Sequence, residues 1–133
     1  MKVFPDANFL VAAGFRPSGD YRRALIVSQD SFLTSEHVLA EVHRNLERLG
    51  LDSVSFIEEL RERMEGTDKF DLLPVGLPLS DWGDRQALAE AIGAACDLFI
   101  TSDTDFNQLF GKRVKGVLIQ TSARYVRDVL FLA

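Results

Sequence analysis

The order of apolar and polar residues divides the chain into short apolar runs separated by longer segments with helical periodicity. The clearest run is residues 98–101. Nothing polar alternates with Leu98, Phe99 and Ile100, which predicts a strand buried on both faces. Similar runs predict strands at residues 3–4 and in the segments 31–34, 116–120 and 70–75, the last being interrupted by a proline.

Between these runs, apolar residues recur every three or four positions, as on one face of a helix. The longest such segment is 35–49, where Ser35 is a suitable N-cap and Gly50 a suitable stop. Other helices are expected at 7–13, at 20–28 with Asp20 as N-cap, at 52–65, after Ser80, at 105–110, and at 121–132 with Thr121 as N-cap. Short strands alternating with helices predict an α/β fold with a parallel sheet and right-handed crossovers.

Two carboxylates follow predicted strands directly. Asp6 ends the first strand, with Pro5 as the strand's last residue, and Asp103 follows the strand at 98–101. The carboxyl ends of parallel strands meet at one edge of the sheet, where ligands bind in open α/β folds. Asp103 and Asp105 could alternatively serve only as N-caps of the next helix.

Two further carboxylates lie on predicted helices. Glu41 is on the flank of the apolar stripe of the 35–49 helix. Asp84 is four residues before Leu88 and therefore in line with a buried stripe, where an unpaired charge is costly. Asp81 falls on the same face, so the helical register alone does not choose between Asp81 and Asp84.

Like charges held close together need a counter-charge, or some of them take up protons. Mg²⁺ or Mn²⁺ would supply it, because hard cations prefer oxygen ligands. Such ions polarise phosphodiesters and activate water, so no nucleophilic side chain is required. The four acids together therefore suggest a metal site for phosphodiester hydrolysis.

Composition changes this picture little. A chain of 133 residues, 47% hydrophobic and 26% charged, fits one domain spanning residues 1–133. There is no transmembrane run and no signal peptide, so we expect a cytoplasmic protein without membrane association. The single Cys96 excludes an internal disulfide and a Cys-based zinc site.

Charge is distributed unevenly along the chain. The net charge is −5, yet residues 106–133 carry five basic residues and one acidic residue. A basic tail on an acidic body can bind a polyanion locally, although a solvated helix face is the alternative. Lys112, Arg113 and Lys115 are the candidate phosphate contacts. His37 and His43 are not spaced like a helical metal pair and are expected to be partly exposed.

Three segments resemble the PIN-domain ribonucleases, in particular the small VapC-like toxins of toxin–antitoxin pairs. Residues 3–10, Val-Phe-Pro-Asp-Ala-Asn-Phe-Leu, are similar to that family's opening motif. Residues 33–42 resemble the segment where a Ser begins the helix carrying the second acid. Residues 84–106 resemble the block "Asp, helix, Asp, apolar strand, Thr-Gly-Asp-x-Asp-Phe", which is the most specific of the three and favours Asp84 over Asp81.

The resemblance covers nearly the whole chain and implies a three-layer α/β/α sandwich with a five-stranded parallel sheet. It implies RNA as substrate, an antitoxin partner and a homodimer. The implied catalytic and metal-binding quartet is Asp6, Glu41, Asp84 and Asp103, with Asn8, Thr101 and Asp105 in supporting positions.

The chain departs from the family pattern at three positions, none of them an acid. Pro5 is unusual beside the first acid, and Ala7 replaces a common hydroxyl residue. Ser102 stands where glycine is usual, which would alter the turn or demand a strained backbone.

Other functions remain open at this point. A phosphatase using Asp6 as nucleophile would need a second Asp at position 8, which is Asn8, and a hydroxyl residue at position 10, which is Leu10. A non-toxin RNA-processing PIN nuclease and a non-catalytic partner-binding module are also compatible. Structure-specific DNA nucleases of PIN-like fold are much longer. The residues Phe56, Ile57 and Leu60 could form a partner surface or ordinary core.

Overall fold

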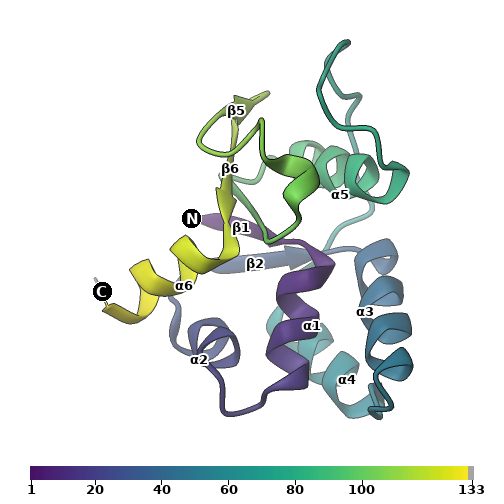
Figure 1. Cartoon of the computed structure of the whole chain (residues 1–133), viewed down its shortest axis with the longest axis vertical. Helices are drawn as coiled ribbons and strands as arrows, with labels where there is room; N and C mark the ends of the chain where they lie inside the picture. Colours follow the sequence, from purple (N-terminus) through teal and green to yellow (C-terminus); the bar gives the residue numbers. More distant parts are fainter. Residues whose placement is uncertain (132–133) are drawn as a thin grey trace.

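The computed structural model describes residues 1–131, which contain one six-stranded sheet with the order β3-β2-β1-β4-β6-β5 (Figure 1). Five of its strands are parallel, and the short β5 pairs antiparallel with β6 at one edge. The strands are β1 (Lys2–Pro5), β2 (Ser31–Thr34), β3 (Glu65–Gly66), β4 (Leu98–Thr101), β5 (Arg113–Val114) and β6 (Val117–Thr121).

Helices connect the parallel strands. They are α1 (Ala7–Phe15), α2 (Asp20–Val27), α3 (Glu36–Arg48), α4 (Val54–Arg63), α5 (Trp82–Gly93) and α6 (Ser122–Phe131), with a 3₁₀ turn η1 (Thr104–Phe106). Helix α1 packs on α2 and α3, and α2 packs on α6. In Figure 1 this group lies on one side of β1 and β2, and α5 lies on the other. The α/β class with helices on both sides of the sheet is confirmed.

The strand order places a topological switch point between β1 and β4. From β1 the chain moves through β2 to β3 in one direction, then crosses back past β1 to β4. Right-handed crossovers in opposite directions place their helices on opposite faces. The connections therefore diverge at the carboxyl ends of β1 and β4, which is the place where ligands bind in open α/β sheets.

The first strand shows why Asp6 lies at the carboxyl end of β1. Pro5 is the last strand residue, as predicted, and pairs with Ile100. Pro5 has no backbone N–H to donate. The backbone N–H of the next residue, Asp6, donates to the Ile100 carbonyl at 2.8 Å. Phe4 and Phe99 stack beneath with ring centroids 6.0 Å apart, and both are fully buried.

One predicted strand is wrong. Residues 70–75 form no strand but cross α5, where Asp71 N–H donates to the Ala89 carbonyl at 3.0 Å. Pro74 and Pro78 remove backbone donors that a strand would need. The edge position is occupied instead by β3, which pairs with β2, and the extra strand β5 raises the count from five to six.

Several helix boundaries also differ from the prediction. Helix α4 is shorter than 52–65 at both ends, and the segment 105–110 contains only the 3₁₀ turn. Asp81, not Ser80, is the N-cap of α5, and Gly19, not Asp20, is that of α2. Thr121 does cap α6, accepting from Arg124 N–H at 3.2 Å. The predicted helix end at residue 132 lies outside the described residues.

The core settles one open alternative. Phe56 and Leu60 are buried in the main apolar cluster, and Ile57 packs against it. These residues of α4 are therefore core rather than a partner surface. Cys96 is also buried and unpaired.

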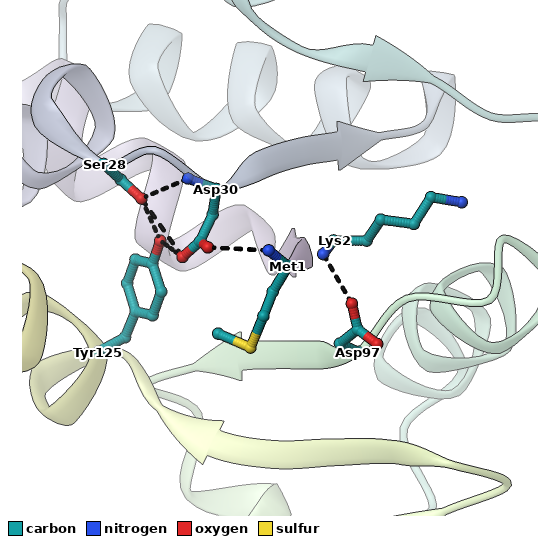
Figure 2. A network of polar contacts seen from close by, with 6 residues as sticks. All are labelled: Met1, Lys2, Ser28, Asp30, Asp97 and Tyr125. Atoms are coloured by element: carbon teal, nitrogen blue, oxygen red, sulfur yellow. Dashed lines mark hydrogen bonds and ion pairs between the residues drawn. The ribbon is translucent and has the colours of Figure 1, made fainter.

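The amino ends of the strands are tied together by a separate polar network (Figure 2). The terminal ammonium of Met1 pairs with Asp30 at 3.1 Å, and Tyr125 from α6 donates to the same carboxylate at 2.8 Å. The backbone N–H of Lys2 donates to Asp97 at 2.8 Å. This network is at the opposite end of the sheet from Asp6. No helix within residues 1–131 has the length and apolar character needed to span a bilayer.

Candidate functional site

Asp6 is held in one orientation by two hydrogen bonds. Its Oδ1 accepts from Ala7 N–H at 2.9 Å, so it caps α1, and its Oδ2 accepts from the Thr101 hydroxyl at 2.8 Å. The side chain is buried, and this burial raises the pKa of Asp6 from 3.8 to about 6 even though both hydrogen bonds lower it. The charges of Glu41 and Asp103 add to the increase. A buried carboxyl of this kind favours binding of a counter-cation.

Thr101 connects the two strand ends. Besides donating to Asp6, its hydroxyl accepts from Asn8 Nδ2 and from Asp103 N–H, each at 3.1 Å. Asn8 Oδ1 accepts from Ser102 N–H at 3.1 Å and so holds the loop after β4. Ser102 is not among the described residues with positive φ. The serine in place of glycine therefore imposes no left-handed strain.

Asp103 begins the 3₁₀ turn and caps it. Its Oδ1 accepts from Asp105 N–H at 2.9 Å. Asp103 is therefore an N-cap, as the sequence allowed. It is also half-buried. Its charge raises the pKa of both Asp6 and Asp84, so it lies near both of these acids. Capping uses only one carboxylate oxygen.

Asp84 is the least satisfied acid of the group. It is 8% exposed on α5, and its Oδ2 has no hydrogen-bond partner within residues 1–131. Burial, then the charge of Asp103 and a hydrogen bond with Asp105, raise the pKa of Asp84 from 3.8 to about 8. Carboxylate oxygens of Asp81, Asp84 and Asp105 lie within 4.8 Å of one another. An orphaned buried oxygen in such a group requires a partner from outside the chain.

Asp81, which the family spacing set aside in favour of Asp84, also belongs to the cluster. It caps α5, with its Oδ1 accepting from Asp84 N–H at 2.9 Å, and its carboxylate faces the cluster. The spacing Asp81-x-x-Asp84 was the available signal, because an N-cap and the third helical residue are joined by that hydrogen bond. The two residues are neighbours rather than alternatives.

Glu41 reaches the site from α3. Its Oε1 lies 3.2 Å from His37 Nε2, one helical turn earlier, and a Cβ placed on Gly83 would lie 2.9 Å from the same oxygen. His37 Nε2 is also 3.4 Å from the Gly83 carbonyl. His37 is thus a half-buried residue that orients Glu41 against the start of α5, a role that its sequence position did not reveal.

The four predicted acids are therefore assembled from four different segments. Glu41 and Asp103 raise the pKa of Asp6, while Asp103, Asp6 and Asp81 raise that of Asp84. These mutual effects indicate that the four acids lie near one another, around the carboxyl ends of β1 and β4. The donor set consists of carboxylates, and within residues 1–131 Asp84 has an oxygen without a hydrogen-bond partner. These features fit a hard divalent cation such as Mg²⁺ or Mn²⁺.

The predicted phosphate contacts lie in and beside the β5–β6 hairpin. Arg113 pairs with Leu118 at the amino end of β6, whereas the acids follow carboxyl ends. Lys115 is 3.7 Å from Asp71, and Lys112 is exposed in the same hairpin. Phosphate binding by these three residues stays a prediction. Arg85, which follows Asp84 on α5, donates to the Leu79 carbonyl at 2.6 Å.

Comparison with solved structures identifies the fold. The chain is similar to the crystal structure of VapBC2 from Rickettsia felis bound to a DNA fragment from their promoter, with a TM-score of 0.66 over 91% of this chain and 98% of that one. Sequence identity is 16%. No protein-family model matches the sequence, and a search of curated proteins found no similar sequence. The fold is therefore a VapC-like, PIN-like α/β fold, as the motifs predicted.

Proposed function

We propose that this protein is a metal-dependent endoribonuclease that hydrolyses RNA phosphodiester bonds at the cluster of Asp6, Glu41, Asp84 and Asp103. The observation that carries the proposal is the buried Asp84, which has an unpartnered Oδ2 within residues 1–131 and a carboxylate oxygen within 4.8 Å of those of Asp81 and Asp105. Without a counter-charge, such an arrangement is unfavourable at neutral pH. A cation-dependent reaction accounts for its presence.

The quartet would hold Mg²⁺ or Mn²⁺, with Asp105 and Asp81 at its border. When bound, the cation supplies polarisation of the scissile phosphate and activation of a water molecule. Hydrolysis then forms a bond from the water oxygen to phosphorus and breaks one bond to a ribose oxygen, which takes up a proton. No side-chain nucleophile takes part.

The remaining residues position these acids. Thr101 and the Ala7 N–H hold Asp6, Asn8 holds the loop that carries Asp103, and His37 holds Glu41. Ligand-orienting contacts of this kind set metal affinity and activity. Thr101 and Asn8 are therefore supporting residues in this proposal. The contacts also explain how Ala7 is tolerated, because its backbone supplies the hydrogen bond.

The substrate and partners follow from the likeness in sequence motifs and fold. The motifs resemble those of ribonucleases, and RNA is recognised mostly through single strands whose bases can be splayed out. The similar solved structure contains VapBC2. We therefore include in the proposal that this chain is the toxin of a toxin–antitoxin pair, binds an antitoxin protein and forms a homodimer.

The test is cleavage of a mixed pool of single-stranded RNA by purified protein. We expect cutting with Mn²⁺ or Mg²⁺, none with chelator, and none by Asp84→Asn. Asp128→Asn is the matched control, because Asp128 lies on α6 in an ion pair with Arg124. Mn²⁺ should raise the melting temperature of wild type and of the control but not of Asp84→Asn.

Two results would count against the proposal. Equal cleavage by Asp84→Asn and wild type would remove the assigned site. Folded wild-type protein, free of bound inhibitor, that neither cuts RNA nor gains stability with Mn²⁺ would instead favour a non-catalytic partner-binding module.

A further inference from the structure

Trp82 is exposed at the border of the acid cluster. It is the only tryptophan of the chain, immediately follows Asp81 and is 73% exposed. Its ring is nearly perpendicular to that of His37, with centroids 5.7 Å apart, and His37 in turn contacts Glu41. A single exposed aromatic residue is ordinary, but Trp82 lines one pocket together with exposed Phe70 and Leu72, and a gathered apolar surface of this kind marks an interaction site.

Trp82 also forms one end of a groove of about 370 Å³ between α5 and the segment that crosses it. Phe70 and Leu72 line the groove from that segment, 72% and 77% exposed, and Arg85 and Gln86 line it from α5. The segment that contains Phe70 packs closely on α5. A Cβ placed on Gly93 would lie only 2.4 Å from Phe70 Cα, so the backbone of the segment occupies the space that a side chain would need. The groove is therefore preformed, and Trp82 links it to the acids through its ring contact with His37, which in turn contacts Glu41.

The charges in the groove suit a nucleotide. Arg85 makes no ion pair with an acid of residues 1–131, and its guanidinium is anchored by the Leu79 carbonyl. Of the two acids that line the groove, Asp71 is paired with Lys115 and Glu90 accepts from the Ser35 hydroxyl at 2.7 Å. An exposed indole with a nearby cation is the combination that single-stranded nucleic acids use for base stacking and backbone contact.

We infer that Trp82 is a stacking platform for an unpaired nucleobase of the RNA strand, next to the phosphodiester held at the acid cluster. This inference rests on the proposed function and adds a specificity-determining residue to it. It means that the substrate must present a base out of its stack, because base pairing would hide the face that the indole contacts. Single-stranded RNA, rather than a duplex, is then the ligand.

The experiment measures RNA binding in the presence of Mn²⁺. The parent protein is Asp103→Asn, which should leave the RNA uncleaved because it lacks one acid of the proposed quartet. The probe is a short, fluorescently labelled single-stranded RNA, followed by anisotropy, and the unlabelled strand is followed by quenching of the single tryptophan. The variants added to this background are Trp82→Ala and Trp82→Phe. The control is Phe131→Ala, which removes another exposed aromatic residue, 68% exposed, at the end of α6.

We expect the RNA to quench tryptophan fluorescence and Trp82→Ala to weaken binding by about 5- to 100-fold, the range that loss of one stacked base implies. Trp82→Phe should bind within a few-fold of the parent, and Phe131→Ala should bind equally well. The corresponding RNA duplex should neither quench nor show a difference between the parent and Trp82→Ala. Melting curves check that each variant is folded. We expect the Trp82 variants to fold, because an exposed side chain contributes little to the core.

The two proposals fail differently. If the parent binds RNA but Trp82→Ala binds it equally well, the platform is wrong, the nuclease proposal stands, and a protein partner becomes the better candidate for the groove. If the parent binds no RNA while its melting temperature shows a folded protein, the proposed function itself fails, and the platform with it.

Discussion

The hydroxyl of Thr101 donates a hydrogen bond of 2.8 Å to Asp6 Oδ2, although the two residues are 95 positions apart in the chain. The same hydroxyl accepts from Asn8 and from Asp103 N–H. One side chain thus joins the ends of β1 and β4 at the switch point. The parallel pairing of these strands, with Pro5 opposite Ile100, makes the contact possible.

We predict that Thr101→Val impairs both the site and the fold. Loss of the hydroxyl removes a hydrogen bond that lowers the pKa of Asp6, so this pKa should rise above about 6. Stability should fall by about 1–3 kcal/mol because buried donors and acceptors lose partners. Activity or metal affinity should fall by about 10- to 100-fold. Thr101→Ser, which keeps the hydroxyl, should retain most of both.

Denaturant titrations and NMR titration of Asp6 would measure these effects. A Thr101→Val protein with wild-type cleavage and unchanged titration of Asp6 would show that this hydrogen bond does not position the acid.

We predict that metal-free protein becomes less stable as the pH rises from about 4 to 8. Folding raises the pKa of Asp6 to about 6 and that of Asp84 to about 8, from 3.8 in both cases. A raised pKa means that the folded state binds more protons than the unfolded state. The contribution of each carboxyl to the free energy of unfolding is therefore complete below pH 3.8 and is lost as the pH rises through the pKa of that group in the folded protein. Binding of Mn²⁺ should strengthen over the same interval, because the metal competes with these protons.

Melting temperatures in chelator, recorded from pH 4 to 8, would test this linkage. Asp84→Asn should show a smaller decline than wild type and should be the more stable of the two at pH 8. Parallel curves for the two proteins would mean that Asp84 does not titrate as its surroundings indicate.

We predict that Gly83→Ala separates activity from stability. A Cβ at this position would lie 2.9 Å from Glu41 Oε1 and 3.3 Å from Asp81 Oδ1, so both carboxylates must move. They are ends of flexible side chains, and alanine favours a helix over glycine by roughly 1 kcal/mol. Stability should therefore be unchanged or slightly higher while cleavage drops.

Gly66→Ala is the control, because nothing lies within 4 Å of a Cβ there. Thermal melts and initial cleavage rates of both variants make the comparison. If Gly83→Ala cleaves RNA at the wild-type rate, the position of Glu41 is not important for the reaction.

We predict that Tyr125→Phe lowers stability by about 1 kcal/mol without changing metal binding or cleavage. The Tyr125 hydroxyl donates to Asp30 and contacts Ser28 at 2.8 Å, in the network at the amino ends of the strands (Figure 2). Tyr21→Phe should have little effect, because within residues 1–131 the Tyr21 hydroxyl makes no hydrogen bond. Urea unfolding would give both values. A loss of activity in folded Tyr125→Phe would show coupling between the two ends of the sheet.

Local patterns in the chain were enough to predict much of the fold. Unbroken apolar runs marked β2 and β4, and Pro5 marked the end of β1, because a strand interior has no place for a residue without an N–H. The 3.6-residue period and Ser35 marked α3, whose N-cap accepts from Val38 N–H as such a serine should. The same reasoning failed for residues 70–75, where apolar residues suggested a strand but the chain packs across α5.

The placement of the acids was decided by tertiary structure. The sequence predicted that Asp6 and Asp103 would lie at the same edge of the sheet. Both follow the carboxyl end of a strand, and parallel pairing brings those ends together. Nothing local showed that Asp81 and Asp105 would lie beside Asp84, that His37 would contact Glu41, or that Lys115 would pair with Asp71. Periodicity reports which face of an element is apolar, whereas contacts between polar groups depend on how elements cross. Trp82 is exposed for that same reason, since only the packed helices and the crossing segment determine which aromatic side chains remain in solvent.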